Sequence, residues 1–206
     1  MFRVGSEDIN YPAGTPRGAR SFAEMTPTIR PAQLADMPPI GAIYVSGHSP
    51  AYRGSVPYSS LRALDSQAEA QSLAVELDKP NSVFLVAVNT VGRVIGFAFV
   101  GMTDHPRLAG LAELHVERRY RRRYGVGSFL AKAAAREFAA RGADTMTAIV
   151  AQSNHPSRAF CAKLGATEEN LGDTMPLFAH DANVPTVPLP LVHVHWNAPT
   201  FANLIN

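Results

Sequence analysis

The sequence predicts an α/β (α+β-like) fold, with a single mixed, mostly antiparallel central sheet of about six to seven strands flanked by helices. Short apolar runs at 83–88, 93–102 and 108–116 follow one another with brief polar connections, which is typical of an antiparallel meander. From Gly127 the apolar spacing becomes helical, and strand-like and helix-like segments then alternate. Because no repeat or low-complexity linker interrupts the chain, these segments predict one domain.

The N-terminal part predicts an extension, a strand and two helices. Residues 1–25 are rich in Gly, Pro and polar residues and lack the apolar core of a signal peptide, so we expect a loosely ordered extension. A short strand is expected near 26–30, and the helix from about Asp36 tolerates prolines in its first turn. A turn-rich loop at 51–60 then leads to a second helical segment at 64–79.

The C-terminal part predicts two more helices, each between strands. The expected segments are a helix at 127–141 that stops at Gly142, a strand at 145–150, a short helix capped by Asn154 and closed by Gly165, and strands from Ala166 and at 190–196. A loop rich in Pro and Asn separates the last two strands. We therefore expect the domain at residues 26–197 and a C-terminal tail at 198–206.

Composition and charge exclude several classes of protein. Hydrophobic residues make up 46% of the 206 residues and charged residues 17%, the balance of a soluble globular protein. The net charge of +2 argues against the broad basic face of a nucleic-acid-binding domain. No apolar run approaches the roughly 18 to 20 residues of a membrane helix. The single cysteine excludes an internal disulfide framework, and we expect a cytoplasmic protein without nucleic-acid or membrane partners.

The stretch ERRYRRRYGVG, Glu117–Gly127, places five arginines and two glycines at the entrance of a helix. The unpaired N–H groups and partial positive charge of a helix N-terminus attract an anion. Gly125 and Gly127 let the main chain approach a phosphate, and arginines add charge-assisted hydrogen bonds. We interpret the stretch as a phosphate-binding loop. The alternative, a nucleic-acid patch, is disfavoured because the basic run has little aromatic interleaving.

In these residues the chain resembles the GNAT superfamily of acyl-CoA-dependent N-acyltransferases. The family motif Gln/Arg-x-x-Gly-x-Gly/Ala matches Arg122, Gly125 and Gly127. The strand LAELHV before it and the segment NHPSRAFCAKLGA after it are similar to two further landmarks of the family. The resemblance runs from about Thr26 to Trp196 and implies the GNAT fold. It also implies acetyl-CoA as the co-substrate, and we expect no metal.

The resemblance assigns cofactor-binding roles along this part of the chain. Backbone groups of Leu114, His115 and Val116 would pair with the pantetheine arm. The main-chain N–H groups of the phosphate-binding loop and of Ser128 would hold the pyrophosphate, and Arg121 or Arg123 would reach the 3′-phosphate. The residues expected at the cofactor are Leu114, His115, Val116, Arg121, Arg122, Arg123, Tyr124, Gly125, Val126, Gly127, Ser128, Asn154, Ser157 and Phe160.

Acetyl transfer to an amine requires a base and an acid. An amine with a pKa of about 10.4 is protonated at pH 7, so a carboxylate or histidine must take a proton. Glu113, on the strand beside the thioester, is the leading candidate for the base, and His115 is the second. Cys161 occupies the position where the family commonly has a tyrosine that protonates the leaving thiolate. Whether Cys161 or water is the acid stays open, because a buried cysteine is usually a small hydrophobe.

The loop after the first helix is expected to frame the acceptor, with His48, Tyr52 and Arg53 as candidate substrate residues. This mixture suggests a small polar acceptor. Together with the resemblance, it implies an N-acetyltransferase that acts by direct attack of a primary amine of a small molecule or amino acid. Two alternatives stay open: acetylation of a protein N-terminus or lysine, and a CoA-binding module without turnover. The sequence also leaves open whether the chain forms a homodimer.

Overall fold

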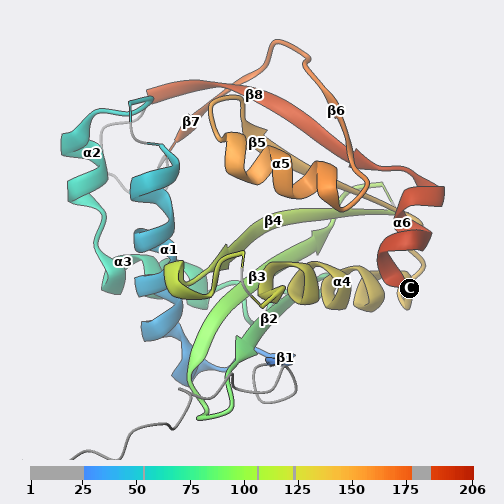
Figure 1. Ribbon diagram of the computed structural model, residues 1–206, viewed down its shortest axis with the longest axis horizontal. Coiled ribbons are helices and arrows are strands. Elements are labelled where there is room, and N and C mark those ends of the chain that lie inside the picture. Colours follow the sequence, from blue (N-terminus) through green and yellow to red (C-terminus); the bar gives the residue numbers. More distant parts are fainter. Residues whose placement is uncertain (1–25, 53, 106, 123, 178–186) are drawn as a thin grey trace, which may run out of the picture.

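The computed structural model describes residues 26–52, 54–105, 107–122, 124–177 and 187–206 (Figure 1). The strands are β1 (Thr28–Pro31), β2 (Ser82–Val88), β3 (Val94–Met102), β4 (Leu108–Val116), β5 (Thr145–Ala151), β6 (Thr167–Glu169), β7 (Thr174–Leu177) and β8 (Val187–Trp196). The helices are α1 (Met37–Ala51), α2 (Tyr58–Ala63), α3 (Ser66–Ala74), α4 (Val126–Ala139), α5 (His155–Lys163) and α6 (Ala198–Ile205), with single 3-10 turns at Leu34–Asp36 and Arg118–Tyr120.

Seven strands lie side by side in the order β1-β2-β3-β4-β5-β8-β6, and β7 pairs with β8. The pairs β2–β3 and β3–β4 are antiparallel, which confirms the predicted meander. Among the strands of the described residues, only β4 and β5 run parallel, so the sheet is mixed and mostly antiparallel, as predicted.

Helices cover both faces of the sheet and bury a separate core on each. On one face, α1 and α3 pack on β2 and β3 through Met37, Ile40, Ile43, Ala70, Leu73, Phe84, Val86 and Phe97. On the other face, α4 and α6 pack on the sheet through Leu130, Phe138, Phe201, Leu204, Ile95, Val194 and Trp196. The strands between the two cores are therefore held from both sides, which gives a rigid platform for a site.

A β-bulge marks the point where β4 and β5 separate. The register between β3 and β4 shifts between Phe99 and Val100, so that Ala112 is the extra residue of β4. The parallel pairing of β4 with β5 ends at the next residue towards the N-terminus, Leu111, opposite Ala148. Beyond this point β4 continues beside β3, while β5 continues beside β8.

The structure differs from the predicted element order in three places. The turn-rich loop at 51–60 leads directly into helix α2, and the loop rich in Pro and Asn contains strand β7. The expected C-terminal tail contains helix α6, in which Phe201 and Leu204 are buried. Asn197 caps this helix by accepting a hydrogen bond from Thr200 N (3.1 Å). Among the helices of the described residues, none is both long and apolar enough to span a membrane.

Candidate active site

The backbone at the end of β4 presents hydrogen-bonding groups on the side where β5 diverges. Glu117 N donates to Ile95 O (2.8 Å), so the alternate residues of β4 before Glu117 bond to β3. The N–H and C=O groups of Leu114 and Val116 therefore point to the other edge. There the Val116 carbonyl accepts a hydrogen bond from Arg121 Nε (2.7 Å).

The loop that follows β4 folds into an anion-binding shape at the start of α4. Arg122 (φ 61°) and Gly125 (φ 66°) both adopt the left-handed backbone conformation, and Gly125 is the N-cap of the helix. No side chain of the described residues caps this N-terminus. The N–H groups of Val126, Gly127 and Ser128 are therefore the unpaired first-turn donors that an anion needs.

Helix α5 packs beside this N-terminus through Phe160. A Cβ atom on Gly127 would stand 3.2 Å from the Phe160 ring and 3.6 Å from Leu114, so the glycine allows close packing of α4 against α5 and β4. Asn154 is buried and caps α5 by accepting a hydrogen bond from Ser157 N (3.3 Å). Of the expected cofactor residues, Gly127, Phe160 and Leu114 thus come together, and Asn154 and Ser157 lie at the start of α5.

Two tyrosines anchor the loop between β4 and α4. Tyr124, expected to cover the cofactor, is half-buried, and its ring centroid lies 6.0 Å from that of Tyr120. The Tyr120 hydroxyl accepts a hydrogen bond from Asn89 Nδ2 (3.2 Å). Tyr124 therefore packs at the edge of the core, at the base of the phosphate-binding loop.

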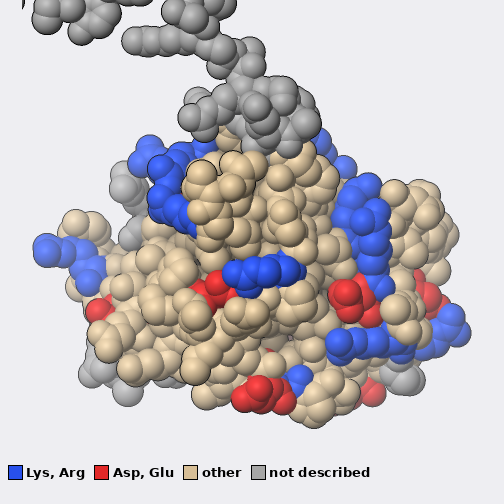
Figure 2. Space-filling view, turned by 90° about the horizontal axis from the view of Figure 1, so that it is seen from below, with Lys and Arg blue, Asp and Glu red and all other residues tan. Residues whose placement is uncertain are grey.

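The arginines of this loop are directed to different partners. Arg119 forms an ion pair with Glu117 (2.8 Å), and Arg121 turns back to the Val116 carbonyl. The Arg121 side chain is therefore hydrogen-bonded to the end of β4, and Arg123 lies outside the described residues. On the face shown in Figure 2, Lys and Arg side chains form separate groups among uncharged residues, which is unlike the continuous basic surface of a nucleic-acid-binding protein.

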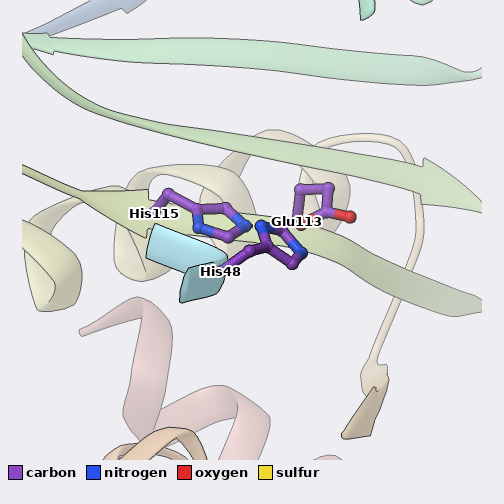
Figure 3. Close-up of side chains that lie close together, drawn as sticks. All are labelled: His48, Glu113 and His115. Atoms are coloured by element: carbon purple, nitrogen blue, oxygen red, sulfur yellow. Dashed lines mark hydrogen bonds and ion pairs between the residues drawn. The ribbon is translucent and has the colours of Figure 1, made fainter. Parts of the chain in front are cut away.

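A second cluster lies on the opposite face of β4, where α1 crosses it (Figure 3). Glu113 and His115 of β4 and His48 of α1 point toward one another, and one ligand-type atom of each lies within 4.8 Å of the others. His115 Nε2 and Glu113 Oε2 are 2.6 Å apart, the distance of a short charge-assisted hydrogen bond. His48 Nδ1 lies 3.0 Å from the Tyr44 carbonyl. The structure thus brings three sequence-predicted residues together across 67 positions of the chain, from His48 to His115.

Aromatic rings and one glycine fix this cluster. The rings of Tyr52, His48, His115 and Phe97 follow one another with centroids 5.0 to 5.4 Å apart. A Cβ atom on Gly47 would stand 2.6 Å from His115 Nδ1, so only glycine lets α1 approach β4 this closely. The rings therefore have little room to rotate away.

The two tyrosines of this region are both kept neutral. Burial, together with the nearby Glu113 carboxylate, raises the pKa of Tyr44 well above its usual range. Burial is also the main cause that raises the pKa of Tyr52, and Glu113 adds to it, while a hydrogen bond with the Asn154 side chain opposes it. Tyr52 therefore links the region of Glu113 to the start of α5, and it carries its phenolic proton at neutral pH.

Cys161 does not belong to either cluster. Its side chain is 4% exposed and packs in the core beneath α4. Burial raises the pKa of the thiol to about 11, with a smaller contribution from Glu168. Such a thiol is a weaker acid than an ordinary cysteine. Of the expected substrate residues, Arg53 lies outside the described residues.

Sequence reasoning missed two residues, Tyr44 and Gly47, that pack against the cluster of His48, Glu113 and His115. An isolated glycine inside a helical segment is a signal for close approach of another element, and Gly47 stands next to His48. The partner of that glycine, His115, could not have been identified, because it depends on how α1 crosses the sheet.

The sequence model of the acetyltransferase (GNAT) family matches residues 40–166, more than half of the chain. The chain belongs to the GNAT family. The predicted family and the predicted fold class are thereby confirmed.

Solved structures agree with the GNAT fold. The PaiA N-acetyltransferase from Thermoplasma acidophilum in complex with coenzyme A is 17% identical, with a TM-score of 0.65 over 82% of this chain and 98% of that chain. The ribosomal-protein-alanine N-acetyltransferase from Brucella melitensis is 22% identical, with a TM-score of 0.59 over 82% and 99%. A phosphinothricin acetyltransferase from Sinorhizobium meliloti in complex with acetyl-CoA is 22% identical, with a TM-score of 0.59 over 84% and 88%. A comparison with curated proteins gave no significant match.

Proposed function

We propose that this GNAT acetyltransferase transfers the acetyl group of acetyl-CoA to a primary amine of a small molecule or amino acid, by direct attack in a ternary complex. The observation that carries the proposal is the position of two sites on β4. One face and edge meet the phosphate-binding loop, and the other face carries Glu113 and His115 beside His48. A cofactor on one side of β4 and a carboxylate–histidine pair on the other would place the acetyl group and the attacking amine close together.

The cofactor side supplies binding and orientation. The N–H groups of Val126, Gly127 and Ser128 would hold the pyrophosphate of CoA, since they lie in the first turn of a helix that no side chain caps. The main-chain groups of Leu114 and the N–H of Val116 would pair with the amides of the pantetheine arm along the free edge of β4. That two of the similar proteins were crystallised with CoA or acetyl-CoA supports this choice of ligand.

On the acceptor side, Glu113 is proposed as the general base and His115 as the residue that positions it. His115 Nδ1 lies against the backbone of α1 at Gly47, whereas its Nε2 bonds to Glu113 Oε2. The imidazole is thus shielded from a substrate. The Glu113 side chain is 29% exposed and His115 only 15%, so the carboxylate is the more accessible of the pair. It would take the proton that the attacking amine loses.

Tyr52 is proposed as the donor of a proton to the departing thiolate, in place of Cys161. Its phenol is protonated at neutral pH and contacts Asn154, the residue that starts α5 next to α4. Cys161, by contrast, is buried in the core. Glu113 and Tyr52 would then act from the same side of β4.

A small acceptor fits this site better than a folded protein surface. The side chain of His48 is 4% exposed, and the rings of Tyr44 and Phe97 surround the carboxylate–histidine pair. The Glu113 carboxylate and the neighbouring aromatic rings suit an ammonium group before it loses its proton.

The test is a panel of amines assayed for loss of the acetyl-CoA thioester, combined with calorimetry for CoA binding. We expect binding of acetyl-CoA and turnover with at least one small amine. Glu113→Gln should lower kcat/KM by about 10²- to 10⁴-fold, the usual contribution of a general base, with the affinity for CoA unchanged. Glu169→Gln, an exposed carboxylate on β6, is the matched control and should behave as wild type. A folded protein that binds neither CoA nor acetyl-CoA would rule out the proposal.

A further inference from the structure

We propose that His48, Glu113 and His115 form a binding site for a divalent cation of the zinc class, and that this cation inhibits acetyl transfer reversibly. The inference rests on the proposed function in one respect, because the cation would occupy the carboxylate proposed as the base. It replaces the expectation that no metal binds, and it concerns a regulatory metal rather than one that the reaction needs.

The three side chains form a suitable set of ligands. Two imidazoles and one carboxylate are ligands that zinc accepts, with a fourth position left for water or another small ligand. Ligand atoms about 2.0 to 2.2 Å from zinc at tetrahedral angles lie about 3.3 to 3.5 Å from one another. The ligand atoms of the three residues lie within 4.8 Å of one another, and the pair His115–Glu113 is 2.6 Å apart. Small side-chain rotations would therefore complete the site, if they bring His48 closer to the other two ligands and move His115 and Glu113 slightly apart.

The hydrogen bond of His48 prepares it as a ligand. A carbonyl oxygen only accepts, so the 3.0 Å contact between His48 Nδ1 and Tyr44 O places the proton on Nδ1. A neutral imidazole with its proton on Nδ1 has its lone pair on Nε2, the nitrogen that lies toward Glu113 and His115 (Figure 3). A backbone carbonyl that holds the second nitrogen is the usual support of a metal-binding histidine.

The residues around the cluster hold the ligand side chains in place before a cation binds. The ring of His115 is confined between Phe97 (centroids 5.2 Å) and Gly47, where a Cβ atom would stand 2.6 Å from Nδ1. His115 therefore presents Nε2 to the cluster. Since the rings are already placed, little freedom is lost when a cation binds. The partly exposed Glu113 side chain leaves a path for the ion to enter.

A bound cation would use the lone pairs of Glu113 and so remove the base. Acetyl transfer would then stop until the ion leaves. A chelator should restore full activity, because no covalent change is involved.

The first experiment is calorimetric titration of Zn²⁺ into the full chain, without a purification tag, after chelator treatment and in the absence of CoA. We expect one equivalent to bind, and His48→Gln and Glu113→Gln each to weaken binding at least tenfold. His193→Gln is the matched control, because His193 Nε2 also lies 2.9 Å from a carboxylate, that of Asp173. Its zinc affinity should equal that of wild type. Circular dichroism checks that each variant folds. If His48→Gln unfolds, Glu113→Gln still tests the site, because Glu113 is the most exposed of the three ligands.

The inference is overturned if no zinc binds, or if Glu113→Gln binds zinc as tightly as wild type. A tetrahedral Co²⁺ absorption spectrum in the visible range, lost in Glu113→Gln, would support it independently of activity. The kinetic arm follows thioester absorbance, since the thiol of released CoA itself binds zinc. Transfer without zinc binding would overturn this inference alone. Zinc binding without transfer to any amine would overturn the proposed function and leave the metal site standing.

Discussion

Cys161 and Tyr52 show how the surroundings of a residue, rather than its type, decide which side chain can exchange a proton. Cys161 stands at the sequence position of the family's usual tyrosine, yet it packs in the apolar core below α4. Tyr52 comes from the other end of the domain and contacts both Asn154 and the region of Glu113. The proposed proton donor is therefore placed by the crossing of α1 over β4, which no local motif records.

Tyr52→Phe tests this assignment. We expect kcat to fall about 10²-fold, in the range of one general acid, with the affinity for acetyl-CoA within about twofold of wild type. The phenyl ring keeps the contact with His48, so packing is retained. Tyr58→Phe, on an exposed tyrosine of α2, is the control. Wild-type kcat in Tyr52→Phe would return the role of acid to water.

Cys161→Ala should leave kcat within about threefold of wild type and lower the free energy of unfolding by about 1 kcal/mol near neutral pH. Thermal and urea denaturation measure the loss of stability, and the thioester assay measures the rate. A fall in kcat of more than tenfold in a folded variant would show that the thiol takes part in the reaction.

The raised pKa of Cys161 also predicts a dependence on pH. The pKa rises from 9.0 to about 11 on folding, so the native state keeps the proton that the unfolded chain loses in this range. The stabilisation is fully present below pH 9 and is lost as the pH rises toward 11, by an amount on the order of 2 to 3 kcal/mol. Urea unfolding of wild type and Cys161→Ala from pH 8 to 11 should show the difference in stability shrinking or reversing as the pH rises. A constant difference would contradict this expectation.

At the scale of elements, the segments predicted correctly are those whose signals are local. The meander follows from apolar runs with short turns, and α5 follows from Asn154 and Gly165 at its two ends. Helix α6 had a signal that was not used: Asn197 as a cap, a proline in the first turn, and Phe201 and Leu204 three positions apart. The splay of β4 from β5 could not be predicted, because the bulge at Ala112 depends on pairing with β3.

The same distinction applies to the candidate site. The helix start at Val126 was readable from Gly125 and Gly127, since glycine spacing is a sequence feature, and the phosphate-binding role of the loop stays a prediction. The cluster of His48 with His115 was not, since it needs two elements far apart in sequence to cross. Arg121 donates a hydrogen bond through Nε to Val116 O, and its expected role at a phosphate stays a prediction.

Gly125→Ala tests the N-terminus of α4 against a matched control at the other end of the same helix. Gly125 (φ +66°) and Gly142 (φ +96°) both need the left-handed conformation, so alanine at either should cost about 1 kcal/mol of stability. Only Gly125→Ala disturbs the N–H groups proposed to hold the pyrophosphate. We expect its CoA affinity to fall at least tenfold by calorimetry, with Gly142→Ala unchanged. Equal affinities in the two folded variants would argue against the phosphate-binding loop.

On the scale of the whole molecule, α6 joins the C-terminal residues to the core formed by the middle of the chain. Phe201 is 2% exposed, and Arg136 Nε of α4 donates to the Ile205 carbonyl (2.6 Å). The segment after β8 is thus part of the domain rather than a tail.

Phe201→Ala should lower the free energy of unfolding by about 3 to 5 kcal/mol, the usual cost of removing a buried phenyl ring. Asn203→Ala, on the exposed side of the same helix, should change it by less than about 0.5 kcal/mol. Urea unfolding of both variants measures the difference. If Phe201→Ala matched Asn203→Ala, α6 would not contribute to the stability of the core.

The strand order also has a consequence for synthesis on the ribosome. Strand β8 lies between β5 and β6 in the sheet, although it is translated after both. A nascent chain can close the β1–β4 meander early, because those partners are neighbours in sequence. The edges of β5 and β6 that β8 covers must wait until residues 187–196 have been made. During that interval the unfinished sheet exposes strand edges that can pair with other chains, so chaperone binding to nascent chains should be strongest just before β8 emerges.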